Sequence, residues 1–96
     1  MKIDFTKNNG ILNVALDGRL DTTTAPDLEK FLGNHYDCAE LLVIDCEKLV
    51  YISSAGLRVL LAAQKKTKGA MKLTKVCELV MEVFEITGFA DILAIE

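Results

Sequence analysis

Two adjacent serines, Ser53 and Ser54, stand directly before a long stretch with helical spacing. Either hydroxyl could cap that helix by accepting hydrogen bonds from free backbone N–H groups. Gly56 follows in the first turn, where glycine is destabilising by roughly 0.5–1 kcal/mol relative to alanine. We interpret the missing side chain as room for the close approach of a partner's backbone or a phosphate. A phosphate on Ser54 would lie at the positive end of the helix dipole.

A phosphate at this position would change the surface more than the fold. A dianion at a helix N-terminus is favoured by roughly 0.3–2 kcal/mol, so the helix should survive modification. A partner packed against bare Ser54 would instead have to desolvate the new charge, which costs on the order of several kcal/mol. The residues therefore allow a phosphorylation switch, and a plain capping role for the serine is the alternative.

The hydrophobic pattern predicts one α/β domain over residues 1–96, with the order ββαβαβαβ. The turn signal Asn8-Asn9-Gly10 indicates an N-terminal β-hairpin. A capping box at Thr24 and Asp27 indicates the start of the first helix. Strands that alternate with helices imply a mostly parallel central sheet with about three main helices. Strands are expected at 2–5, 11–16, 41–44, 71–74 and 92–95, and helices from 24 to about 35, from 54 to 68 and from 76 to 87.

The serines belong to a segment that such a sheet would place at its functional edge. Sites in these folds gather where the carboxyl ends of strands meet helix N-termini, which here is residues 45–58. Asp45 is interpreted as an anchor of the loop that follows its strand. His35, on the apolar stripe of the first helix, is interpreted as a partly buried helix-end residue without a catalytic role.

Composition excludes several classes of function. The net charge of −3 argues against direct nucleic-acid binding, which needs clustered Lys and Arg. The longest apolar runs are too short to span a bilayer, and the N-terminal residues lack the apolar core of a signal peptide. A cytoplasmic location is therefore expected. Cys38, Cys46 and Cys77 are widely spaced, which favours buried free thiols over a disulfide or zinc site. No cofactor or metal ligand set is expected.

The segment Leu49–Arg58, which reads LVYISSAGLR, resembles the signature of the STAS family, named for sulfate transporters and anti-sigma-factor antagonists. The loop Gly18–Asp21 and the late segment Thr87–Phe89 extend the resemblance over nearly the whole chain. Because no transporter part is present, the stand-alone antagonist branch is the closer comparison. Ser53 stands where these antagonists often carry aspartate, and Ala55 where they often carry serine or threonine. Ser53 is thus a second candidate acceptor, although its position before the helix favours it over Ser54 as the cap.

The resemblance implies an anti-sigma factor antagonist that is not itself an enzyme. Its unphosphorylated form would bind an anti-sigma factor that is also a serine kinase, and so release a sigma factor. That kinase would use its bound ATP to phosphorylate Ser54, and a serine phosphatase could reverse the modification. Asp21 would lie on the loop beside the acceptor, and a turn residue that bonds its own backbone is the alternative for it. The partner-binding residues implied are Asp21, Thr22, Ser53, Ser54, Ala55, Gly56, Leu57 and Arg58, with Leu57 and Arg58 on the exposed first turn.

Two other functions are weighed against the switch. The same fold could serve as a constitutive adaptor, such as the small STAS subunit of a lipid-transport ATPase complex or another signalling assembly, without phosphorylation. A nucleotide hydrolase is disfavoured because the chain lacks the GxxxxGK[ST] motif, a Ser/His/Asp set in a recognisable context and a metal cluster.

Overall fold

The computed structural model describes the backbone of all 96 residues and every side chain except that of Cys38. The chain opens with an antiparallel hairpin in which β1 (Lys2–Asn8) pairs with β2 (Ile11–Leu20). The turn residues Asn9 and Gly10 have φ angles of 50° and 80°. Positive φ at both central positions gives the turn the twist that hairpin strands need. The expected hairpin is therefore confirmed.

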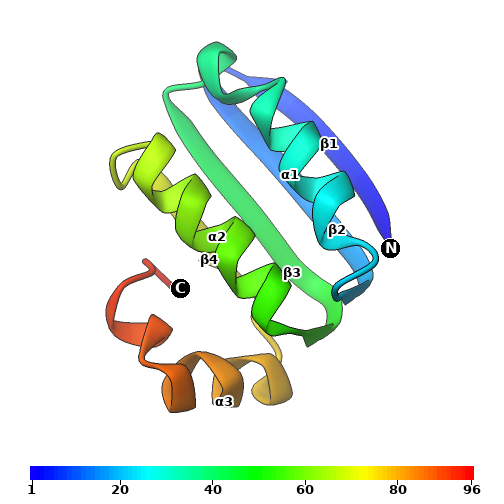
Figure 1. Cartoon of the computed structure of the whole chain (residues 1–96). Coiled ribbons are helices and arrows are strands. Elements are labelled where there is room, and N and C mark those ends of the chain that lie inside the picture. The colour runs from blue at the N-terminus through cyan, green and yellow to red at the C-terminus, as the bar shows by residue number, and fades with distance from the viewer.

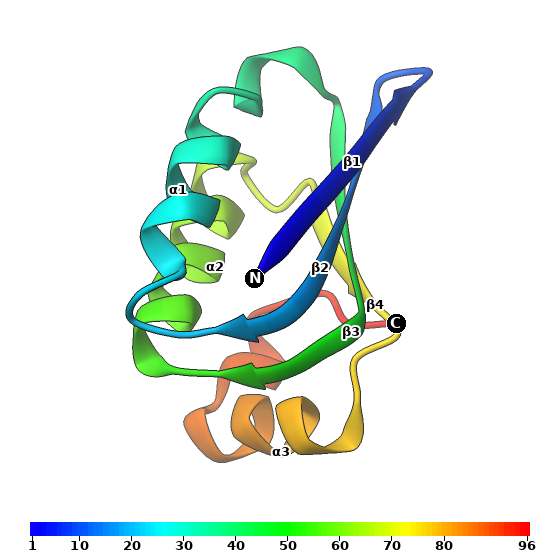
Figure 2. The ribbon, with the colours of Figure 1, turned by 90° about the vertical axis from the view of Figure 1, so that its right-hand side faces the viewer.

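The later strands add to β2 in parallel. β3 (Leu41–Ile52) pairs with β2 and β4 (Met71–Thr74) pairs with β3, so the order across the described backbone is β1-β2-β3-β4. α1 (Ala25–Gly33) and α2 (Ser54–Lys66) cover one face of the sheet, and α3 (Glu78–Thr87) lies beyond one end of it (Figure 1, Figure 2). This is the predicted α/β class with a mostly parallel sheet.

The core lies between the sheet and the helices. Burial alternates along the first halves of β2 and β3, which is the period-2 pattern of strands that have one covered face. Each fully buried aliphatic or aromatic side chain contributes about 1.5–3 kcal/mol relative to an exposed one. Every layer supplies such side chains, among them Val14, Leu28, Ile44, Leu60 and Phe84.

β2 and β3 are both longer than the sequence predicts. β2 was expected to end at Leu16, but it continues to Leu20. Its pairing with β3 shifts register at two points on either side of Gly18, which has a φ of 114°. β3 was expected to end at Ile44, but it continues to Ile52. Asp45 is therefore a mid-strand residue, and its interpretation as a loop anchor was wrong.

Smaller differences occur towards the C-terminus. α3 begins at Glu78 and not at Val76, and Gly88 ends it in the left-handed conformation, as predicted. The last expected strand consists of one parallel bridge between Leu73 and Ile95, at which the Leu73 N–H donates to the Ala94 carbonyl at 2.8 Å. Short 3-10 turns, Tyr36–Cys38 and Phe89–Asp91, follow α1 and α3.

The thiols of Cys46 and Cys77 are free. Cys46 is buried in β3, and burial, with a smaller effect of Asp45, raises the pKa of its thiol to about 12. Cys77 is partly buried, and its Sγ donates to the Leu49 carbonyl at 3.4 Å. The side chain of Cys38 lies outside the described part of the structure. No helix among the described residues has the length and apolarity to cross a bilayer.

Candidate functional site

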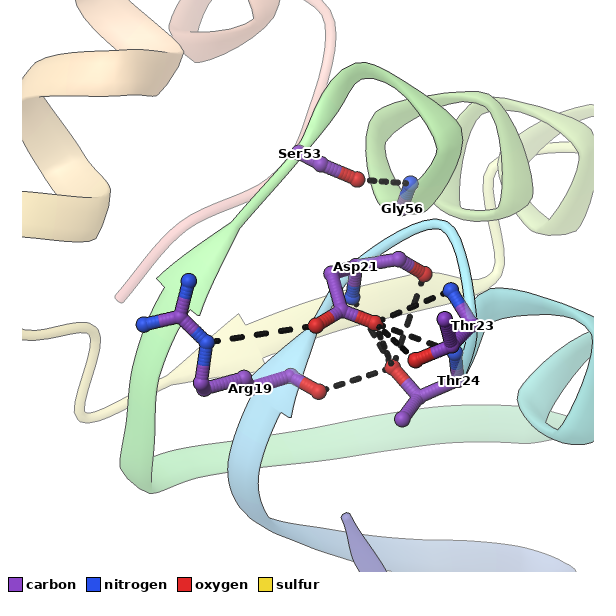
Figure 3. A network of polar contacts seen from close by, with 6 residues as sticks. All are labelled: Arg19, Asp21, Thr23, Thr24, Ser53 and Gly56. Atoms are coloured by element: carbon purple, nitrogen blue, oxygen red, sulfur yellow. Dashed lines mark hydrogen bonds and ion pairs between the residues drawn. The ribbon is translucent and has the colours of Figure 1, made fainter.

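The two serines at the start of α2 have different roles. Ser53 is the N-cap, and its Oγ accepts a long hydrogen bond of 3.5 Å from the Gly56 N–H (Figure 3). Its carbonyl accepts the Leu57 N–H at 2.9 Å. Ser54 is the first residue of the helix and its side chain is exposed. The prediction that Ser53 caps the helix is confirmed, and the Ser54 hydroxyl is left accessible.

Asp21 organises the loop between β2 and α1. Its Oδ1 accepts the hydroxyl of Thr23 at 2.7 Å, the Thr23 N–H at 3.0 Å and the Thr24 N–H at 3.1 Å (Figure 3). The Thr24 hydroxyl donates to the Arg19 carbonyl at 2.7 Å and makes no cap bond, so the capping box expected with Asp27 does not form. The N–H groups of Thr23 and Thr24, which precede α1, bond to the Asp21 carboxylate instead.

These hydrogen bonds favour the ionised form of Asp21. The Thr23 hydroxyl contributes most, and the backbone N–H groups of Thr23 and Thr24 add to it, so the pKa of the carboxyl lies below its ordinary value of 3.8. A carboxylate is therefore present at this edge throughout the neutral range.

Replacement of Asp21 by asparagine is expected to make folding stability less dependent on pH. Because the pKa of Asp21 is lower in the folded chain, its ionisation stabilises the fold above pH 3.8, and this contribution is lost as the pH falls further. Denaturant unfolding of both proteins at pH 7 and in steps below pH 4 measures the difference. Equal losses of unfolding free energy in Asp21→Asn and the unmodified protein would contradict the assigned role of the loop.

The parallel register of β2 and β3 brings the two loops together. Leu20 and Ile52 are partners in the ladder, so Asp21 and Ser53 each lie just beyond it. The Ser53 N–H donates to the Leu20 carbonyl at 2.9 Å, which ties the two strand ends directly. The structure thus gathers residues from both loops at the carboxyl edge of the sheet, as the sequence predicts.

Two of the predicted site residues face inward. Gly56 is buried, and a Cβ atom there would lie 2.7 Å from Leu20 Cγ and 2.9 Å from Ile52 Cγ1. Its lack of a side chain allows α2 to pack against the strand ends, and the interpretation as room for a partner or a phosphate was wrong. Leu57 is 6% exposed and belongs to the core, so its expected place on the exposed first turn was also wrong.

Arg19 and Tyr51 form a contact that no pattern in the sequence indicates. They are cross-strand partners, and the Arg19 guanidinium carbon lies 4.0 Å from the centre of the Tyr51 ring. Arg19 Nε is also 3.9 Å from Asp21 Oδ2 (Figure 3). Tyr51 is 36% exposed and the adjacent Val50 53% exposed. The stacked pair therefore presents a cationic and aromatic surface beside Asp21.

A shallow groove lies between the first turns of α1 and α2. It has a volume of about 190 Å³ and is lined by Thr22, Ala25, Pro26, Glu29, Ala55, Arg58 and Val59. Thr22, Ala55 and Arg58 are residues that the resemblance implies for partner binding. Thr22 and Arg58 are exposed, and Ala55 is partly so.

His35 lies away from this site. Its ring stacks on Phe31 at 4.2 Å between centroids and meets Phe5 edge-on at 5.0 Å, and its Nδ1 is 2.6 Å from the Phe31 carbonyl oxygen. The interpretation as a partly buried helix-end histidine is confirmed. Among the described side chains, no group of three or more His, Cys, Asp or Glu is placed to hold a metal ion.

Comparisons with known proteins agree with this geometry. The STAS domain model matches residues 2–96. BtrV of Bordetella bronchiseptica, described as a candidate anti-sigma factor antagonist, is 41% identical over 96% of this chain and 83% of its own length. The anti-sigma-B factor antagonist of Bacillus subtilis is 30% identical over 99% of this chain and 90% of its own length.

Solved structures share the fold. The Bacillus cell fate determinant SpoIIAA in its phosphorylated form superposes with a TM-score of 0.76, over 99% of this chain and 91% of its own, at 13% sequence identity. The family model matches nearly the whole sequence and the fold is shared with solved structures, so this chain belongs to the STAS domain family.

Proposed function

We propose that this protein is an anti-sigma factor antagonist switched by phosphorylation of Ser54. The unphosphorylated form binds an anti-sigma factor that is also a serine kinase, and a sigma factor is thereby released. The kinase transfers the γ-phosphoryl group of its ATP to the Ser54 oxygen, whose proton is lost, and ADP leaves. A serine phosphatase hydrolyses the phosphoester and restores binding. The protein is a binding partner and not an enzyme, and it works in the cytoplasm, where its partner finds ATP.

The exposure of Ser54 at the first position of α2 is the observation that carries the proposal. Ser53 already supplies the cap, so the Ser54 hydroxyl is not required for helix stability. The first N–H groups of a helix have no intrahelical partners and attract an anion. Phosphorylation is therefore compatible with the fold, and SpoIIAA of the same fold exists in a phosphorylated form.

The proposed contact surface surrounds this serine. Asp21 supplies a fixed carboxylate, Arg58 an exposed cation and the Arg19–Tyr51 pair an aromatic anchor. Gly56 and Leu57 support the surface from beneath. The surface residues are Arg19, Asp21, Thr22, Val50, Tyr51, Ser53, Ser54, Ala55 and Arg58.

Mass spectrometry of the modified protein tests the acceptor. After incubation with ATP and an anti-sigma serine kinase from the same genome, the chain should gain about 80 Da at Ser54. Ser54→Ala should gain none, and the matched variant Ser53→Ala should still be modified at Ser54. A phosphate found on Ser54→Ala, or on Ser53 alone, would contradict the proposal.

The constitutive adaptor makes a different prediction for the same protein. It requires a complex with a transport ATPase that is equally stable with Ser54 bare or phosphorylated. A pull-down that recovers the same partner in equal amount with both forms would favour the adaptor and contradict the switch.

Truncation of Tyr51 is expected to weaken binding to the kinase by about ten-fold, because buried tyrosine and arginine side chains dominate protein interfaces. The change Tyr51→Phe keeps the ring under Arg19 and should lose little. Isothermal titration calorimetry on Tyr51→Ala, Tyr51→Phe and the unmodified protein measures the difference. Unchanged affinity in Tyr51→Ala would exclude this pair from the contact surface.

A further inference from the structure

α3 presents a stripe of apolar side chains to solvent. Leu79 is 57% and Ile86 84% exposed, and Val83 lies between them, partly buried. These residues are spaced by four and three positions, which places them on one side of the helix. Apolar residues scattered singly are normal on protein surfaces, whereas an aligned set marks a contact site.

A row of carboxylates runs beside this stripe. Its members are exposed and share the same spacing of four and three; they are Glu78, Glu82 and Glu85. Within the described part of the chain, none of them has an ion pair or side-chain hydrogen bond. Residues 76–96 contain no lysine or arginine. The preceding lysines, Lys72 and Lys75, are already in ion pairs. The negative charge along α3 is therefore uncompensated.

The opposite side of α3 holds the helix on the domain. Val80 and Phe84 are fully buried in the core, and Gly88 closes the helix in the left-handed conformation. The core therefore does not depend on Leu79 or Ile86. Their exposure has no structural purpose in the single chain, and polar replacements there should leave the fold intact.

We propose that this face of α3 is a docking surface for a cationic helix of a partner protein that has an apolar side. The stripe of Leu79, Val83 and Ile86 would pack against the apolar side of that helix, as in helix pairs with anchors at such spacing. The glutamate row would face its Lys or Arg residues and speed the encounter. This surface shares no residue with the site around Ser54, so binding here should persist when Ser54 is phosphorylated.

Titration of the full chain with a synthetic helical peptide tests the surface. The probe carries leucines on one side and lysines on the other, and a matched peptide carries glutamates in place of the lysines. NMR amide shifts should map the lysine peptide to residues 78–87. The double variant Leu79→Ser, Ile86→Ser should weaken its binding by about ten-fold or more. The variant Glu82→Gln, Glu85→Gln should weaken it by a few-fold and flatten its salt dependence.

Controls separate docking from general attraction to an acidic chain. The double variant Phe5→Ser, Asp37→Asn changes an exposed apolar and an exposed acidic residue outside α3 and outside the contact surface around Ser54, and it should bind the lysine peptide as the unmodified protein does. Equal binding of the glutamate peptide, or unchanged binding after both α3 variants, would overturn the proposal. Sedimentation showing a dimer that Ile86→Ser dissociates would assign the face to a second copy and overturn the proposed occupant.

Discussion

A phosphate on Ser54 is expected to weaken binding of the anti-sigma kinase by about a hundred-fold or more. The exposed hydroxyl belongs to the proposed contact surface, four residues before Arg58 on the same helix. A partner that packs there must desolvate a charge of roughly −1.5 to −2 or leave it unpaired, at a cost of several kcal/mol. Because about 1.4 kcal/mol corresponds to a factor of ten in affinity, a cost of this size lowers the affinity by about a hundred-fold or more.

Calorimetric titration of the kinase with both forms of the protein measures this loss. Ser54→Asp should reproduce part of it, because aspartate adds one negative charge at the same place. Thr87→Asp adds the same charge at an exposed position at the end of α3 and should bind the kinase normally. Equal affinity of the phosphorylated and bare forms would contradict the switch.

A methyl group at Gly56 is expected to reduce the free energy of unfolding by about 1–3 kcal/mol. Its Cβ would lie under 3 Å from Leu20 and Ile52, which are both buried and cannot move freely. The better helix propensity of alanine offsets up to about 1 kcal/mol of this loss. In a domain of this size each kcal/mol lowers the melting temperature by about 4–8 °C.

Gly33 provides the matched control for Gly56→Ala. It also lies in a helix, but no atom lies within 4 Å of where its Cβ would be. Gly33→Ala should therefore raise stability by about 0.4–1 kcal/mol. Thermal unfolding of both variants measures the contrast. A Gly56→Ala protein as stable as the unmodified one would show that Gly56 does not set the packing of α2.

Local signals in the sequence predicted much of the fold. The turn at Asn9 and Gly10 needs positive φ, and the left-handed end at Gly88 favours glycine, so their residue types specify the structure directly. The lengths of β2 and β3 could not be predicted in this way. Polar residues such as Asp45 fit on a strand whose one face is left uncovered by helices, and they were mistaken for a loop.

The candidate site was predicted in its position but not in all its parts. Ser53 and Ser54 precede a helix, and the sequence alone indicates which could cap it. The role of Gly56 depends on Leu20, far away in the chain, and becomes visible only when α2 lies against the strand ends. The Arg19–Tyr51 pair depends on a register that includes two irregular steps, which no residue pattern revealed.

The melting temperature of the protein phosphorylated at Ser54 alone is the most direct test of the central claim, which is that α2 accepts charge at its first residue without losing its structure. Because the phosphate would face the free N–H groups of the first turn, we expect a melting temperature equal to that of the bare protein or higher. A fall of several degrees on phosphorylation would mean that the modification disrupts the fold and that Ser54 is not a tolerated site of charge.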